Sequence, residues 1–206
     1  MSIQLYRHAV SGHSHRVQLM LSLLDLPFEL VDVDLLAGAH KAPAFLALNA
    51  FGQVPVLQDG DVILADSNAI LVYLVSRYAQ PGVWLPTEPV AAAQMQRWLS
   101  VAAGPLAFGP AVARVIQLFK LPTDPKDAMA RATQLFGVME AHLQQSDYLV
   151  GSTPTLADIA NYSYVAHAPE GGVSLQPYPH VRAWLARIEA LPGFVPMVRT
   201  AIGLAA

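Results

Sequence analysis

The segment FGQVPVLQDGDVILADSNAI, residues 51–70, contains two neighbouring features that could bind a small ligand. Apolar runs on either side of Asp59-Gly60 predict a β-hairpin with a tight turn. Pro55 lies in the first run, and because proline has no N–H to donate, it is confined to strand starts, bulges and sheet edges. We therefore expect this strand to begin at a sheet edge, where the backbone beside Pro55 can pair with a ligand.

The second feature is the pair Asp66-Ser67, which falls where the hairpin ends and a helix begins. Ser67 is placed to cap this helix, and unpaired N–H groups at a helix start favour an anion. An unpaired strand edge next to such a helix start predicts a site for a peptide-like ligand. The same pattern also fits a plain hairpin that is followed by a capped helix.

The elements that position these residues alternate between strand and helix. Val17, Met20, Leu21 and Leu24 recur at helical spacing, and short β-prone runs flank them. Strand, helix and strand within about thirty residues form a βαβ unit with parallel strands. The expected elements are, in order, strand 3–6, a helix ending at Pro27, strand 28–34, a short helix 43–48, the hairpin and helix 67–78. This order predicts a four-stranded mixed sheet, the pattern of a thioredoxin-like domain.

After residue 78 the strand patterns end and the remaining residues predict helices. Kinks are expected where Gly104-Pro105 and Gly109-Pro110 interrupt the first of them. Thr155 and Asp158 have the spacing of a capping box that opens a later helix. The helices are expected at 88–118, around 129–143, at 156–166 and around 181–188. We therefore expect an α/β domain over residues 1–78, a linker over 79–87 and an all-α domain over 88–206.

Composition limits the class of protein. Of 206 residues, 54% are hydrophobic and 13% charged, which indicates a globular protein with a well-filled core. A net charge of −3 gives no basic surface for nucleic acid or anionic lipid. The chain has no cysteine, so any thiol chemistry must use a thiol that the ligand brings. Without an apolar signal core or an uninterrupted apolar span, we expect a soluble, cytoplasmic protein.

Four segments together resemble the cytosolic glutathione transferases, in particular the bacterial members of that superfamily. They are SGHSHRV at 11–17, FLALNAFGQVPVL at 45–57, DSNAI at 66–70 and GSTPTLADIA at 151–160. The resemblance extends over essentially the whole chain. It implies glutathione as co-substrate, no metal, and a helical domain that contributes the site for a hydrophobic electrophile.

The resemblance also implies which residues hold glutathione. In this family the proline corresponding to Pro55 is cis, and the backbone of Val54 pairs with the cysteinyl unit like an added strand. Asp66 and Ser67 match the pair that holds the γ-glutamyl end. The carboxylate suits the ligand's ammonium, while the Ser67 hydroxyl and N–H suit its carboxylate.

Three further residues are assigned a place by the resemblance. Gln53 matches a position that often supplies a polar contact to glutathione. His40 lies where related classes bind the glycyl carboxylate, and its neighbour Lys41 is the alternative cation. Phe51 precedes Gly-Gln-Val-Pro, where some classes place an aromatic residue that inserts into a second subunit, so we expect a C2 homodimer.

Activation of the glutathione thiol needs a donor for the sulfur anion. A cysteine thiol has a pKa near ~8.5, and lowering it by about 2 units requires about 2.7 kcal/mol of preference for the anion. A hydroxyl donor contributes about 1.5–3 kcal/mol when its acceptor is charged, and a helix N-terminus adds about 0.3–1 kcal/mol. The segment between the first strand and the first helix can supply both contributions.

Three hydroxyl groups near that segment are candidates. Ser11 aligns with the catalytic serine of serine-type classes and is the residue we expect to activate the thiol. Tyr6 lies within the strand, and Ser14 is expected to cap the helix. His13 stands where many bacterial relatives have asparagine. It can donate to the sulfur, accept its proton, or be an exposed histidine at the helix start.

The sequence thus predicts a serine-type glutathione transferase that adds glutathione thiolate to a hydrophobic electrophile. Candidates to line the electrophile site are Trp98, Ala102, Leu106, Phe108 and Val112. A glutathione-dependent disulfide reductase or peroxidase is the alternative enzyme, and a non-catalytic interaction protein on the same fold is the alternative from another class. The absence of an active-loop cysteine argues against cysteine-type classes and against a zeta-like isomerase.

Overall fold

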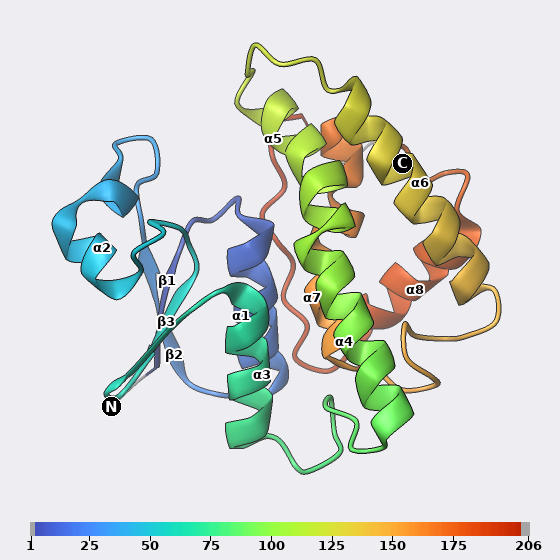
Figure 1. The fold of residues 1–206 in the computed structure, drawn as a ribbon, viewed down its shortest axis with the longest axis horizontal. Coiled ribbons are helices and arrows are strands. Elements are labelled where there is room, and N and C mark those ends of the chain that lie inside the picture. The colour runs from blue at the N-terminus through green and yellow to red at the C-terminus, as the bar shows by residue number, and fades with distance from the viewer. Residues whose placement is uncertain (1–2, 203–206) are drawn as a thin grey trace. The chain divides into compact units, whose positions relative to one another are not determined.

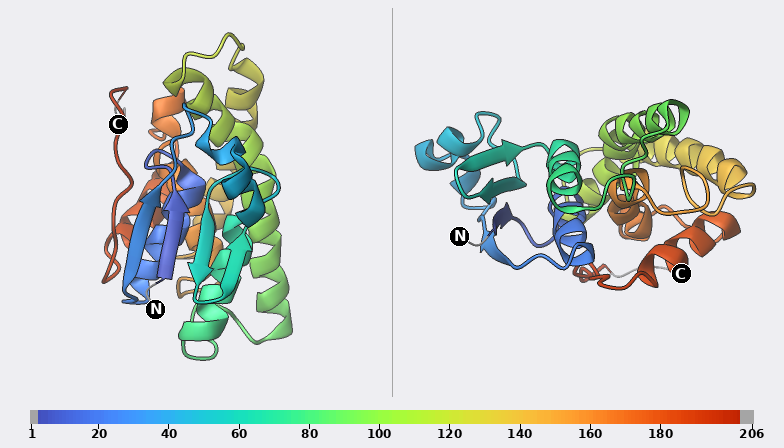
Figure 2. Two further views of the ribbon diagram at one scale, coloured as in Figure 1. Left: turned by 90° about the vertical axis from the view of Figure 1, so that its left-hand side faces the viewer. Right: turned by 90° about the horizontal axis from the view of Figure 1, so that it is seen from below.

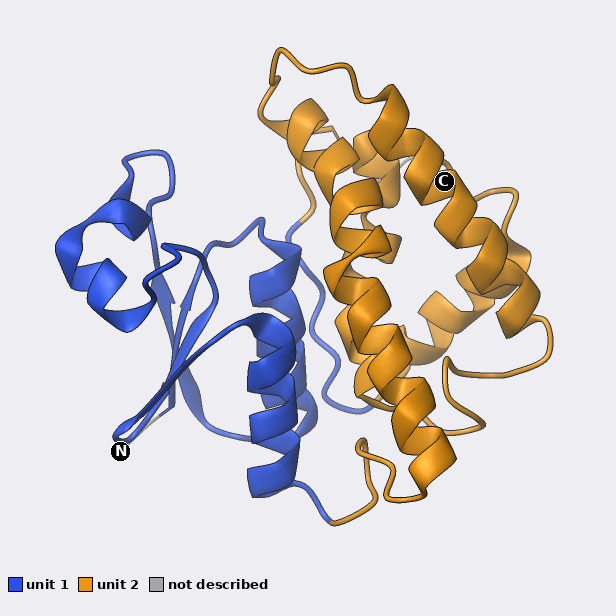
Figure 3. Cartoon of the chain, viewed as in Figure 1, with its two compact units in different colours: residues 1–80, 192–198 blue, residues 81–191, 199–206 orange. Residues whose placement is uncertain are grey.

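The computed structural model describes residues 3–202 and divides the chain into two compact units (Figures 1 and 3). Unit 1 contains Met1–Gln80 and Pro192–Val198, and unit 2 contains Pro81–Leu191 and Arg199–Ala206. The segment Pro192–Val198 therefore groups with unit 1, although we expected the whole of 88–206 in the helical domain. Two contacts explain this difference, because Ser22 Oγ donates to Gly193 O at 2.6 Å and His15 Nε2 donates to Val195 O at 2.9 Å.

Unit 1 is built on a four-stranded mixed sheet with the strand order β2-β1-β3-β4. The central strand β1 (Ile3–Arg7) pairs in parallel with β2 (Phe28–Asp32) and antiparallel with β3 (Val56–Asp59). The edge strand β4 (Val62–Ala65) pairs antiparallel with β3. This arrangement confirms the expected thioredoxin-like domain.

The strand after Pro55 differs from the expectation in one respect. β3 lies inside the sheet between β1 and β4, not at an edge. Pro55 directly precedes the first residue of β3, Val56. Because Pro55 lies outside the strand, its lack of an N–H group does not interrupt the hydrogen bonds between the strands. The Val54–Pro55 peptide bond is cis, as the resemblance implies.

Helices cover both faces of the sheet. α1 (Gly12–Leu23) and α3 (Ser67–Tyr78) lie on one side, and α2 (Pro43–Leu48) lies on the other (Figures 1 and 2). Fully buried side chains fill the first layer, among them Leu5, Met20, Leu57, Ile70 and Leu71. A smaller cluster of Val33, Phe45 and Val56 joins α2 to the other face. Each face of the sheet therefore holds one helical layer in place.

The starts of α1 and α3 are capped by residues other than those expected. Ser11 caps α1, where its Oγ accepts a hydrogen bond from Ser14 N at 3.2 Å. Asp66 caps α3, because with φ at 70° its Oδ1 reaches back to the N–H groups two and three residues on, both at 2.9 Å. Ser14 thus lies inside α1, and Ser67 is the first residue of α3.

Unit 2 is helical throughout its regular structure. Its helices are α4 (Pro89–Ala103), a π-helical turn (Ala107–Ala111), α5 (Val112–Leu118), α6 (Lys126–Leu143), α7 (Leu156–Ala166) and α8 (Pro179–Glu189). The kinks are confirmed, since Gly104 ends α4 and Pro110 lies in the π-helical turn. By length and composition alone 89–118 could cross a membrane, but its most apolar window is half buried inside the fold, as in a core helix.

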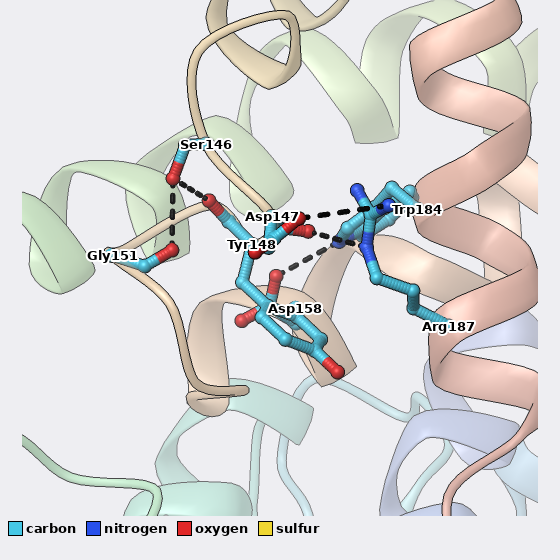
Figure 4. Close-up of polar contacts among 7 residues, drawn as sticks. All are labelled: Ser146, Asp147, Tyr148, Gly151, Asp158, Trp184 and Arg187. Carbon is cyan, nitrogen blue, oxygen red and sulfur yellow. Dashed lines mark hydrogen bonds and ion pairs between the residues drawn. The ribbon is translucent and has the colours of Figure 1, made fainter.

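The predicted capping box at Thr155 forms. Its Asp158 is also hydrogen-bonded to Trp184 of α8, which ties α7 to the rest of unit 2 (Figure 4). One oxygen of the buried Asp158 carboxylate accepts from Leu149 N at 2.9 Å and from Trp184 Nε1 at 2.8 Å. The other oxygen accepts from the N–H of Thr155 at 2.8 Å and from its hydroxyl at 3.2 Å. A single carboxylate of α7 therefore accepts from donors in α8 and in the segment before α7.

Candidate functional site

The fold of unit 1 brings all nine predicted site residues to one cavity of about 770 Å³. They are Ser11, His13, His40, Lys41, Gln53, Val54, Pro55, Asp66 and Ser67. The remaining lining comes mainly from the loop between α2 and β3, which includes Asn49 and Phe51. A cavity of this size lies within the range of small-molecule sites.

One wall of the cavity is the backbone around Val54. Val54 forms no backbone hydrogen bond with the described residues 3–202. The loop is held by buried Asn49, whose Nδ2 donates to Gln53 O at 2.8 Å and whose Oδ1 accepts from Phe51 N at 3.1 Å. A braced segment with unpaired backbone groups can pair with a peptide-like ligand. The sequence analysis missed Asn49, although an asparagine two residues before a loop tip is typical of an Asx-turn.

The start of α3 forms another part of the wall. Arg16, 1% exposed, donates from NH1 to Ser67 Oγ at 3.3 Å and to Asn68 Oδ1 at 3.0 Å. Asp66 already accepts the hydrogen bonds of the N–H groups of Asn68 and Ala69. Binding of an anion at this helix start would therefore depend on Ser67 and on the positive charge of Arg16. The sequence analysis missed Arg16. Its signal was a charged residue four positions before Met20, on the apolar face of the helix.

Ser11 lies at the start of α1 and lines the cavity. Its oxygen accepts the capping bond from Ser14 N, so its hydroxyl proton is not used by the cap. The hydroxyl can therefore donate to an anion in the cavity while the positive end of α1 adds a second stabilising contribution. The rival Tyr6 donates to Gln58 Oε1 at 3.3 Å and is not among the residues that line the cavity.

His13 is a half-buried histidine in the same wall. Its Nδ1 lies 3.5 Å from Ser67 Oγ. Burial, and secondly the positive charge of Arg16, lower the pKa of His13 from 6.5 to about 3. His13 is therefore neutral at neutral pH, and it can both donate and accept a hydrogen bond.

This lowered pKa predicts a loss of stability in acid. In the unfolded chain His13 has its ordinary pKa of 6.5, whereas in the folded chain the pKa is about 3. The folded state binds fewer protons, so the contribution of His13 is complete above pH 6.5 and is lost as the pH falls below it. Between pH 7 and 5 we expect a loss of about 1–2 kcal/mol from this group. Urea unfolding at both pH values measures it.

The variant His13→Asn is the matched control for the acid effect, because asparagine keeps a polar group without a titrating one. Its free energy of unfolding should fall by about 1–2 kcal/mol less than that of the parent over the same pH interval. Equal losses in the two proteins would show that His13 does not titrate with a lowered pKa.

His40 and Lys41 lie at the side of the cavity formed by the turn Ala39–Lys41. Lys41 Nζ donates to Phe51 O at 3.3 Å and to Gly52 O at 3.1 Å, so this cation braces the loop. His40 Nδ1 is buried and has no partner among residues 3–202. Both side chains line the cavity, and both stay candidates for binding a carboxylate.

The candidates for the electrophile site differ in exposure. Ala102 and Leu106 are fully buried in unit 2 and belong to its core, which the kinked-helix pattern did not reveal. Trp98 is 2% exposed, whereas Phe108 is 63% and Val112 36% exposed. Of the five, only Phe108 and Val112 present substantial apolar surface. Residues 3–202 contain no group of three His, Asp or Glu side chains that could hold a metal ion.

Comparison with known proteins identifies the family. Residues 1–76 match the family described as "Glutathione S-transferase, N-terminal domain", and residues 102–192 match "Glutathione S-transferase, C-terminal domain". Glutathione S-transferase 3 of Zea mays is 38% identical over 204 residues, which cover 93% of this chain and 91% of that protein.

Solved structures give the same result. A glutathione S-transferase from Pseudomonas fluorescens has a TM-score of 0.90 at 37% identity and covers 96% of this chain and 100% of its own. A glutathione transferase homologue of Drosophila mojavensis, solved with bound glutathione, has a TM-score of 0.83 at 28% identity over 93% of this chain and 89% of its own. The chain therefore belongs to the cytosolic glutathione S-transferase superfamily, a superfamily of enzymes.

Proposed function

We propose that the protein is a serine-type glutathione transferase, which stabilises the thiolate of glutathione with Ser11 and adds it to a hydrophobic electrophile. The observation that supports this most directly is the combination of two features in one cavity. The unpaired backbone of Val54 suits a peptide-like ligand, and the hydroxyl of Ser11 caps a helix start beside it. Because the chain has no cysteine, the reacting thiol belongs to the ligand.

Each part of glutathione has a chemical counterpart in the cavity. The cysteinyl backbone pairs with Val54. The γ-glutamyl carboxylate binds at Ser67, where the positive charge of Arg16 stabilises it, and the ammonium binds Asp66. Both capping bonds of Asp66 end on Oδ1, so Oδ2 is the oxygen proposed for the ammonium. The glycyl carboxylate binds His40 or, alternatively, its neighbour Lys41, and Gln53 supplies a further polar contact to glutathione.

In the reaction, the thiol loses its proton to water and the sulfur anion accepts the hydroxyl proton of Ser11 as a hydrogen bond. The sulfur lone pair then forms the bond to carbon of the electrophile. A leaving group such as halide departs with the electron pair of the bond that breaks. Together the hydroxyl and the helix start supply about 2–4 kcal/mol, which is enough to lower the thiol pKa by about 2 units. His13, being neutral, is the second residue of this wall with a proposed catalytic role.

Calorimetric titration with glutathione, followed by turnover of an aryl halide, tests the proposal. We expect binding at millimolar concentrations or below and release of halide with formation of the thioether. Faster turnover of a small disulfide or a hydroperoxide than of the aryl halide would instead indicate the reductase or peroxidase alternative. Absence of glutathione binding at millimolar concentration would overturn the proposal in favour of a non-catalytic interaction protein.

The proposal includes a cytoplasmic location and a role in the detoxification of electrophiles. Membership of the cytosolic superfamily supports the location. The apolar side chain of Val112, exposed on unit 2, suits a hydrophobic second substrate, whereas Phe108 lines a separate cavity of that unit. Separation of a cell extract into soluble and membrane fractions checks the location.

We further propose that two copies form a C2 homodimer through Phe51. This side chain is 80% exposed at the loop before β3, and exposed aromatic surface of this kind marks interaction sites. Unit 2 has a separate cavity of about 580 Å³ between α4 and α6. Its apolar lining is Trp98, Val101, Pro105, Phe108, Leu135 and Val138.

The apolar lining of this second cavity suits an aromatic occupant. In the proposed dimer, Phe51 of each copy enters the α4–α6 cavity of the other, as two-fold symmetry requires.

Replacement of Phe51 by alanine should weaken the dimer. Transfer of this ring from water into an apolar cavity contributes roughly 1.5 kcal/mol or more, so the dissociation constant should rise at least about tenfold. Sedimentation velocity over a range of concentrations measures the change. Leu36, 82% exposed in the same unit but outside both cavities, is the matched control, and Leu36→Ala should leave sedimentation unchanged. Unchanged sedimentation of Phe51→Ala would contradict the role of Phe51.

A further inference from the structure

The hydroxyl of Ser67 lies between a permanent donor and a histidine. Arg16 NH1 is 3.3 Å from Ser67 Oγ, and His13 Nδ1 is 3.5 Å from the same oxygen. The Ser67 side chain is buried, with 5% exposure. These three groups come from α1 and from the first residue of α3, so the packing of the two helices sets their distances.

The protons in this cluster can be assigned from chemistry. A guanidinium only donates, so Ser67 Oγ is the acceptor for Arg16. Ser67 has one hydroxyl proton, and a buried hydroxyl is rarely left without an acceptor. The acceptor within reach is His13 Nδ1. When Nδ1 accepts, a neutral imidazole carries its own proton on Nε2.

A bound anion changes this assignment. The proposed carboxylate of the γ-glutamyl unit is a stronger acceptor than a neutral imidazole, so it takes the Ser67 hydroxyl proton. Ser67 Oγ still has a lone pair beyond the one that faces Arg16, and His13 can then donate to it from Nδ1. The imidazole keeps its net charge, because the proton that leaves Nε2 through water is matched by the proton that arrives at Nδ1.

We propose that the tautomer of His13 follows the occupancy of Ser67, which gives His13 a positioning role in addition to its proposed catalytic role. Its Nδ1 accepts the Ser67 hydroxyl proton in the absence of an anion and donates to Ser67 Oγ when an anion binds. The inference rests on the proposed function, which places a ligand carboxylate at Ser67. It goes beyond that function, because the tautomer also decides whether Nε2 is a donor or an acceptor.

The surrounding charges are compatible with a neutral imidazole in both states. The positive charge of Arg16, also on α1, disfavours a second positive charge on His13. Burial of the imidazole likewise disfavours its protonated form. Asp66 directly precedes Ser67, but its Oδ1 is occupied by two N–H groups of α3. The cation Lys41 donates to two loop carbonyls at the α2 side of the cavity.

Nitrogen NMR of histidine-labelled protein tests the switch directly, since the two nitrogens of a neutral imidazole have different shifts with and without a proton. His13→Asn identifies the His13 signals. We expect the proton on Nε2 in the free protein and on Nδ1 after addition of S-methylglutathione, with no such change in Ser67→Ala. S-methylglutathione has no thiol, so the readout is independent of conjugation.

The outcomes separate the inference from the proposed function. Calorimetric binding of S-methylglutathione without any change of tautomer overturns the inference alone. Absence of binding overturns the proposed function and with it the inference. A protonated His13 in either state also overturns it.

Discussion

Replacing Ser11 with alanine should lower the rate of conjugation by roughly 10- to 150-fold and leave glutathione binding largely intact. The range follows from the loss of one hydroxyl donor to a charged sulfur, about 1.5–3 kcal/mol, at about 1.4 kcal/mol for each factor of ten. Binding should survive because the contacts proposed for the peptide part of the ligand are made by Val54 and Ser67, which lie elsewhere in the lining of the cavity. Steady-state kinetics with an aryl halide, calorimetry and the ultraviolet absorbance of bound thiolate measure the three effects.

The structure adds a complication to this experiment, because Ser11 is also the N-cap of α1. Alanine at an N-cap costs about 0.5–2 kcal/mol of stability, whereas glycine costs only a few tenths. Ser11→Gly is therefore the matched variant. It should lose the same conjugation activity as Ser11→Ala while it retains most of the stability. Equal activity in wild type and both variants would transfer the activating role to His13.

Much of the fold could be predicted because prolines and capping residues determine where many of its helices and strands begin and end. α2 begins at Pro43 and α7 follows the capping residue Thr155, and both helices have the predicted bounds. The cavity was predictable for a related reason. Its nine expected residues lie in four short segments, at 11–13, 40–41, 53–55 and 66–67, each next to the start of a helix or a strand.

The features that could not be predicted depend on backbone angles or on contacts between residues far apart in the sequence. The capping role of Asp66 depends on its positive φ, and the sequence does not show which member of an Asp-Ser pair turns back over the helix. The support of Ser67 by Arg16 joins residues 51 positions apart. The return of Pro192–Val198 to α1 depends on two side chains, His15 and Ser22, that have no pattern pointing to residue 193 or 195.

Asp158→Ala should be the most destabilising single change in unit 2, at about 3–5 kcal/mol. Asp158 is fully buried, and its carboxylate accepts four hydrogen bonds, from Leu149 N, Trp184 Nε1 and the N–H and hydroxyl of Thr155. Figure 4 shows the bond from Trp184. Removal of the acceptor leaves buried donors without partners, each of which costs about 1–3 kcal/mol. Water that enters the space satisfies part of them, so the sum is smaller than four separate losses. Urea unfolding followed by circular dichroism measures the change.

Two neighbours of Asp158 make the result specific to the buried network. Asp147 is the matched carboxylate, since its side chain is 66% exposed and lies 3.9 Å from Arg187 NH1 in the same region. Asp147→Ala should change stability by less than about 1 kcal/mol, as exposed ion pairs do. Trp184→Phe keeps an apolar ring and removes one of the four hydrogen bonds, while Asp158 still accepts the other three. It should therefore lower the free energy of unfolding less than Asp158→Ala does. If Asp158→Ala were no more destabilising than Asp147→Ala, the carboxylate would not be the group that joins α7, α8 and the loop before α7, and packing alone would hold them together.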